Sequence, residues 1–119
     1  IVVSPDHGPW LKALSSLFEI VWATTWGDKA NDVFGSFFGL ERCAVLDLDE
    51  LPRTGTRKLG HVAAFAGQRA VARVDDELYD DAERWAADRD EPTLLIRTAP
   101  YVGLRAEHVD RLRDFASAV

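Results

Sequence analysis

Methionine is absent from this sequence of 119 residues, and cysteine occurs only once, at Cys43. A single cysteine excludes an intramolecular disulfide and is typical of a reducing compartment, so we expect a cytoplasmic protein with Cys43 in its core. Because translation begins with methionine, Ile1 is either a processed terminus or the first residue of a fragment. We favour the fragment, and therefore a domain truncated at its amino terminus.

Long apolar runs and an excess of basic residues are also missing. No stretch of about 18 apolar residues is present, which argues against a membrane span. The first residues lack the basic flank and apolar stretch of a signal peptide. The net charge of −6 argues against nucleic acid or an anionic membrane as a partner, because either requires a basic surface. No dinucleotide-binding glycine loop, P-loop or Cys-x-x-Cys motif occurs.

Length and composition indicate one domain over residues 1–119. The chain is 47% apolar and 29% charged, which is ordinary for a globular protein large enough to bury a core. Length and composition do not predict an oligomeric state.

Hydrophobic periodicity predicts alternating helices and strands. Helices are predicted at residues 9–17, 30–38, 58–66, 80–88 and 105–118, and strands at residues 19–23, 44–48, 70–74 and 93–96. Helices that alternate with apolar strands are typical of βαβ units. We therefore predict an α/β fold, a three-layer α/β/α sandwich with a mostly parallel, Rossmann-like sheet.

Polar residues follow two of these strands directly. Thr24 and Thr25 follow the strand at 19–23, and Asp75 and Asp76 follow the strand at 70–74. In open parallel sheets, ligands bind at the carboxyl ends of the strands. Lys58, at the start of a predicted helix, adds a cation between them in sequence. These groups together are suited to a phosphate and a divalent cation.

In this order the residues resemble three motifs of the haloacid dehalogenase-like (HAD) superfamily, whose members are mostly Mg²⁺-dependent phosphohydrolases. Residues 20–24 resemble its strand ending in Thr, residues 57–59 its helix-start Lys, and residues 74–76 its strand ending in acidic residues. The resemblance covers nearly the whole chain and is nearest to small members without a cap domain. It implies a phosphorylated small molecule or an exposed phosphate group as substrate.

The resemblance also implies roles for individual residues. Thr24 would hydrogen-bond the phosphate oxygens, and Lys58 would neutralise them and keep a nucleophilic carboxylate ionised. Asp75 and Asp76 would be ligands of Mg²⁺. Thr25 and Trp26, just past the threonine strand end, are assigned to substrate binding.

The first HAD motif, an apolar strand ending Asp-x-Asp, has no good match. Residues 1–6 imitate it with Ser4 at the nucleophile position, where no base would activate a serine. Residues 45–50 contain Asp47-Leu48-Asp49, but they follow the threonine strand and would need a permuted chain. We read residues 1–3 as the last strand of a hairpin. The nucleophile strand, central in the sheet, is therefore expected upstream of Ile1, on about 15–30 further residues.

Each element also has a plainer interpretation. Thr24 could simply end a strand, and Asp75 and Asp76 could form a turn or cap the following helix. Lys58 could be a solvated lysine at the start of a helix, and Arg57 beside it could take the same role as Lys58. The three histidines, His7, His61 and His108, share no metal-ligand spacing and are expected in solvated or capping positions. Two further functions therefore remain open: an inactive HAD-like module that binds a phosphorylated ligand or a protein, and, more weakly, a receiver-like signalling domain.

Overall fold

The computed structural model describes residues 7–23, 43–48, 50–99 and 102–119. Its elements are α1 (His7–Leu14), β1 (Val21–Trp22), β2 (Ala44–Val45), α3 (Leu59–Ala66), β3 (Val71–Asp75), α4 (Asp80–Asp88), β4 (Thr93–Arg97) and α5 (Ala106–Ala118). The predicted helix at residues 30–38 and the predicted strand at residues 1–3 lie outside the described residues. The other predicted elements are present, and the alternation of strands and helices confirms an α/β fold.

The strands form two parallel pairs. β3 and β4 pair over five residues each, with Val71 opposite Thr93 and Asp75 opposite Arg97. β1 and β2 pair over two residues each, with Val21 opposite Ala44. In the part of the chain that the structure describes, the two pairs are separate two-stranded sheets. Parallel pairing is therefore confirmed, whereas a single continuous sheet is not observed.

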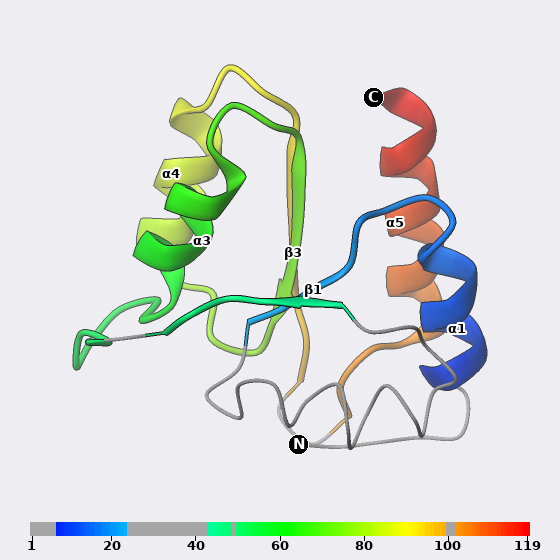
Figure 1. The fold of residues 1–119 in the computed structure, drawn as a ribbon, viewed down its shortest axis with the longest axis horizontal. Helices are drawn as coiled ribbons and strands as arrows, with labels where there is room; N and C mark the ends of the chain where they lie inside the picture. Colours follow the sequence, from blue (N-terminus) through cyan, green and yellow to red (C-terminus); the bar gives the residue numbers. More distant parts are fainter. Residues whose placement is uncertain (1–6, 24–42, 49, 100–101) are drawn as a thin grey trace.

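The hydrophobic core lies between one face of the β3–β4 pair and the helices α1 and α5. Ile96, which is 1% exposed, lies at its centre with Leu14, Val109 and Leu112. Ala72 and Val74 of β3 pack against this cluster. Because successive side chains of a strand point to opposite faces, Arg73 and Asp75 lie on the other face. Figure 1 shows α3 and α4 on that side of β3.

Arg89 joins the amino-terminal ends of β3 and β4. Its guanidinium donates to the hydroxyl of Thr93 at 2.6 Å, and to the carbonyl oxygens of Gly67 at 3.1 Å and Arg69 at 2.5 Å. The same guanidinium lies 5.0 Å from the ring centroid of Trp85 on α4. One side chain therefore connects α4, the end of α3 and the start of both strands.

The last helix begins with a histidine cap. The backbone N–H of Arg105 donates to Nδ1 of His108 at 2.9 Å, and the His108 side chain is buried. This contact satisfies a backbone donor that precedes the first turn, as capping side chains do. Of the two roles predicted for the histidines, solvated or capping, His108 has the capping one. Among the described residues, no helix is long and apolar enough to cross a membrane.

Candidate functional site

Three of the six predicted site residues, Lys58, Asp75 and Asp76, belong to the described chain. Thr24, Thr25 and Trp26 lie outside the described residues, which resume at Cys43. Asp75 is the last residue of β3, and Lys58 directly precedes α3. The following contacts concern the carboxyl end of β3 and the chain that surrounds it.

Asp75 is held by the protein through both of its carboxylate oxygens. Oδ2 accepts from the guanidinium of Arg73, two residues earlier on the same face of the strand, with the two side chains 11% and 15% exposed respectively. Oδ1 accepts the backbone N–H of Asp76 at 2.8 Å and that of Glu77 at 3.4 Å. Because α4 has Tyr79 at its N-cap, the acidic pair forms a turn after β3 and does not cap this helix.

The two adjacent aspartates differ in pKa. Burial by itself raises the pKa of Asp75, but Arg73, a hydrogen bond from Asp76, the charge of Lys58 and the Glu77 amide together hold it below the ordinary value. The pKa of Asp76 is raised, chiefly by its hydrogen bond to Asp75 and then by burial and by the Asp75 charge. Asp75 is thus the member of the pair that ionises first.

Lys58 is brought to the acidic turn by the fold. Its charge is close enough to lower the pKa of Asp75, although α3 separates the two residues in sequence. Lys58 is half-buried, and its ammonium has no hydrogen-bond or ion-pair partner among the residues described. Lys58 therefore acts electrostatically on Asp75, and its part in a site with Asp75 and Asp76 stays a prediction.

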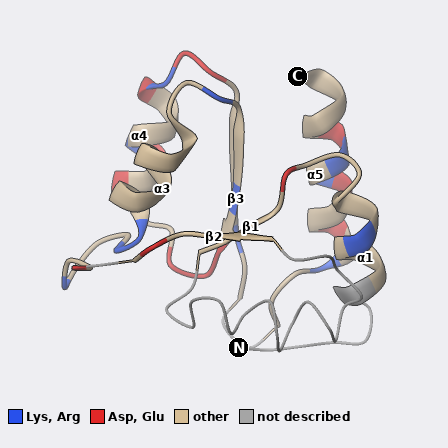
Figure 2. Ribbon diagram, viewed as in Figure 1, with Lys and Arg blue, Asp and Glu red and all other residues tan. Residues whose placement is uncertain are grey.

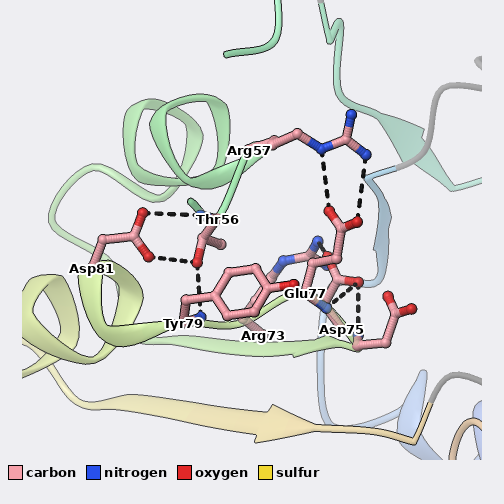
Figure 3. A network of polar contacts seen from close by, with 8 residues as sticks. Thr56, Arg57, Arg73, Asp75, Glu77, Tyr79 and Asp81 are labelled. Atoms are coloured by element: carbon pink, nitrogen blue, oxygen red, sulfur yellow. Dashed lines mark hydrogen bonds and ion pairs between the residues drawn. The ribbon is translucent and has the colours of Figure 1, made fainter. Parts of the chain in front are cut away.

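Arg57, the predicted substitute for Lys58, has a different partner. Its Nε lies 3.3 Å from Oε2 of Glu77, and its Nη2 lies 3.5 Å from Oε1. Figure 3 shows Arg57 reaching from the chain before α3 to Glu77 in the turn after β3. Arg57 is therefore engaged by Glu77, whereas Lys58 adds its charge to that of Arg73 in lowering the pKa of Asp75.

A buried threonine ties the loop before α3 to the start of α4. The backbone N–H of Thr56 donates to Oδ2 of Asp81 at 2.9 Å, and its hydroxyl donates to Oδ1 at 2.6 Å. The same hydroxyl accepts the N–H of Tyr79 at 2.9 Å (Figure 3). Gly55 precedes it at φ +72°, and a Cβ there would lie 2.8 Å from Oδ2 of Asp81. We call Gly55, Thr56, Tyr79 and Asp81 the Thr56 clamp.

Carboxylate oxygens are the ligands that Mg²⁺ prefers, so the acidic pair fits this ion by type. Asp76 is the better placed of the two, because Asp75 already accepts three hydrogen bonds from Arg73, Asp76 and Glu77. Within the described ranges, no group of three or more His, Cys, Asp or Glu side chains is arranged to hold a metal ion. Any further ligand has to come from other residues, from water or from substrate.

Arg73, Thr56 and Asp81 were missed by reasoning from sequence. A signal for Arg73 was present, because a charged residue inside an apolar strand, two positions before Asp75, needs an acidic partner on its own face. The contact of Thr56 with Asp81 joins residues far apart in the chain, and no local pattern marks it. No protein-family model, curated protein or solved structure matches this chain.

Proposed function

We propose that this chain is part of a Mg²⁺-dependent phosphohydrolase of the HAD-like type. The observation that carries the proposal is the acidic pair at the carboxyl end of β3, where the charge of Lys58 helps to lower the pKa of Asp75. A cation beside an acidic pair suits phosphoryl transfer, which needs positioning and charge stabilisation more than covalent help from the protein. The single cysteine supports a cytoplasmic location for this activity.

In this proposal Asp76 is the direct ligand of Mg²⁺, and Asp75, held by Arg73, fixes the turn that presents it. Bound Mg²⁺ would supply positive charge next to the phosphoryl oxygens. Lys58, whose ammonium has no partner in the described part of the chain, would neutralise the phosphate. Thr24, Thr25 and Trp26, which follow β1 in sequence, are proposed to contact the phosphate and the substrate.

The nucleophile is proposed to be an aspartate on a strand that this sequence does not contain, in an Asp-x-Asp motif upstream of residue 1. The support is the separation of the parallel pairs, since β1 and β3 each have one hydrogen-bonded neighbour among the described strands. Joining both pairs into one parallel sheet would need such a strand together with a realignment of the β1–β2 pair, which runs across β3 in Figure 1. With α1 and α5 on one side and α3 and α4 on the other (Figure 1), that sheet would be the middle layer of the proposed α/β/α sandwich.

Phosphatase activity of the protein expressed from its full gene tests the proposal, after its intact mass and amino-terminal sequence have been determined. We expect Mg²⁺-dependent hydrolysis of para-nitrophenyl phosphate that EDTA abolishes. Lys58→Ala should lower kcat about 100-fold, because it removes a charge that stabilises the transition state. Lys12→Ala, which removes an exposed lysine of α1, should leave the rate unchanged. Hydrolysis that is insensitive to both EDTA and Lys58→Ala would contradict the assignment.

The engagement of both Asp75 oxygens within the protein favours one alternative, a catalytically inactive HAD-like module that binds a phosphorylated ligand or a protein partner. This alternative predicts that inorganic phosphate binds to the full-length protein without any turnover, and that Lys58→Ala weakens the binding. Calorimetric titration of phosphate, beside the hydrolysis assay, distinguishes the two functions.

A further inference from the structure

A pocket of about 360 Å³ lies between the loop before α3 and the segment after β3. It is lined by Arg53, Thr54, Gly55, Arg57, Glu77 and Tyr79. Arg57 is the sequence neighbour of Lys58, and Glu77 follows Asp76 directly. The pocket is therefore built from the same two segments that carry Lys58 and Asp76.

The pocket is more positive than the protein as a whole. Two arginines and one glutamate line it, whereas the entire chain has a net charge of −6. Figure 2 shows basic residues before α3 next to the acidic turn after β3. Arg97 adds another cation nearby, with its guanidinium 5.4 Å from the ring centroid of Tyr79. With two arginines against one glutamate, the lining of the pocket itself favours an anionic ligand, although acidic residues of the turn after β3 are close by.

The two arginines of the pocket differ in availability. Arg53 has no hydrogen-bond or ion-pair partner in the described ranges. Arg57 has Glu77, but the contacts are long, at 3.3 and 3.5 Å, and the side chains are 42% and 36% exposed. Exposed ion pairs of this kind contribute little free energy, so an incoming anion competes with Glu77 for Arg57 at small cost.

The walls of the pocket are held in place before any ligand arrives. The Thr56 clamp joins the loop that carries Arg53 and Arg57 to the segment that carries Tyr79. The clamp therefore fixes the backbone from which both arginines extend, so that only their side chains have to become ordered when a ligand binds. A guanidinium is also suited to planar carboxylates, because its fork of donors matches two oxygens at once.

We propose that this pocket binds a second anionic group of the phosphorylated substrate, with Arg53 as its main contact and Arg57 as the second. The inference depends on the proposed function for the position of the phosphate. It names the substrate class as small phosphate esters that also carry a carboxylate or a further phosphate.

Calorimetric titration of the full-length protein with two non-hydrolysable probes in the presence of Mg²⁺ tests the proposal. One probe is 3-phosphonopropionate, which carries a carboxylate, and the other is propylphosphonate, which does not. We expect the first to bind about tenfold more tightly, as a charge-assisted contact predicts. Arg53→Gln should abolish this preference, and Glu77→Gln should increase it by freeing Arg57. Arg111→Gln, an equal loss of charge on the exposed face of α5, should leave it unchanged.

Equal affinity for the two probes, or a preference that survives Arg53→Gln, would overturn the pocket assignment and leave the phosphohydrolase proposal intact. Conversely, the preference could depend on Arg53 while the affinity for propylphosphonate is unchanged by removal of Mg²⁺ and by Lys58→Ala. This result would support the anion pocket and contradict the phosphohydrolase. Failure of both probes to bind would overturn both proposals.

Discussion

Asp75 and Asp76 carry the same side chain at adjacent positions but have different partners. Asp75 is bound by Arg73 and by two backbone amides, whereas Asp76 is influenced mainly by Asp75 itself. A sequence pattern of two aspartates therefore contains one residue that organises the turn and one that remains available. The local partners decide the role of each aspartate, because hydrogen bonds donated to a carboxylate stabilise its ionised form.

At the residue scale, Gly55→Ala is expected to lower the free energy of unfolding by about 1–2 kcal/mol or more, since a side chain at positive φ is strained and the added Cβ would strike Asp81. Urea unfolding measures the change. The matched variant Gly60→Ala lies in α3 with no atom within 4 Å of its new Cβ. It is expected to stabilise the protein by about 0.5–1 kcal/mol. Equal effects of the two variants would contradict the close approach of Gly55 to Asp81.

Asp81 makes stability depend on acid pH. Its pKa is lowered, first by the hydroxyl of Thr56 and then by the Thr56 amide. A depressed pKa in the folded state stabilises the protein above the unfolded pKa of about 3.9 and ceases to do so as pH falls through the folded value. Asp81→Asn should therefore destabilise the protein at about pH 6, and the difference from wild type should shrink toward about pH 3.

Urea unfolding across this range measures the Asp81 effect, with Asp80→Asn as the control for loss of an acidic group in the first turn of α4. A constant difference between wild type and Asp81→Asn from about pH 6 to about pH 3 would show that the carboxylate charge is not what holds Thr56.

At the scale of elements, α5 is attached to the sheet by few side chains. Leu112 is 5% exposed and lies in the cluster with Ile96 and Leu14. Leu112→Ala should lower the free energy of unfolding by about 2–4 kcal/mol, because a cavity replaces packed atoms. Asp110→Ala, at an exposed position of the same helix, should change it by less than about 0.5 kcal/mol. Guanidinium unfolding followed by circular dichroism compares the two, and similar losses would contradict the packing of α5.

The same scale shows which features were predictable from sequence. The helix predicted at residues 80–88 is observed at Asp80–Asp88, and β3, β4 and α5 differ from their predicted ranges only at their ends. These elements have strong apolar periodicity, which reports directly on burial. β1 and β2 are shorter than the predicted strands, because pairing with a neighbour decides how far a strand extends.

The candidate site was predictable only in part. Lys58, Asp75 and Asp76 follow from their places at helix start and strand end, which topology brings to one edge. The Arg57–Glu77 pair and the Thr56 clamp depend on contacts between distant segments, and no spacing rule reveals those. Arg73 was predictable in part, because its partner Asp75 is two residues away in sequence, whereas its burial is known only from the structure.

At the scale of the whole molecule, the two strand pairs should differ in local stability. The Thr98 N–H donates to the Asp75 carbonyl at 3.0 Å beside the long β3–β4 pair, and the Leu46 N–H donates to the Trp22 carbonyl at 2.9 Å beside the short β1–β2 pair. We expect amide hydrogen exchange at Leu46 to be at least about tenfold faster than at Thr98, since fewer contacts must break. Equal protection would show that both pairs open as one cooperative unit.

The position of Arg89 has a consequence for how this protein can vary. Arg89 fastens the ends of β3 and β4 that lie farthest from the acidic turn, through the carbonyl oxygens of Gly67 and Arg69 and the hydroxyl of Thr93. The opposite ends are followed by the turn that carries Asp76 and Glu77. Insertions and exchanges in the loop at residues 51–54 are therefore expected to reshape ligand preference while the scaffold keeps its alignment. The fold therefore places the contacts that align the strands at one edge and the loops that can vary in sequence at the opposite edge.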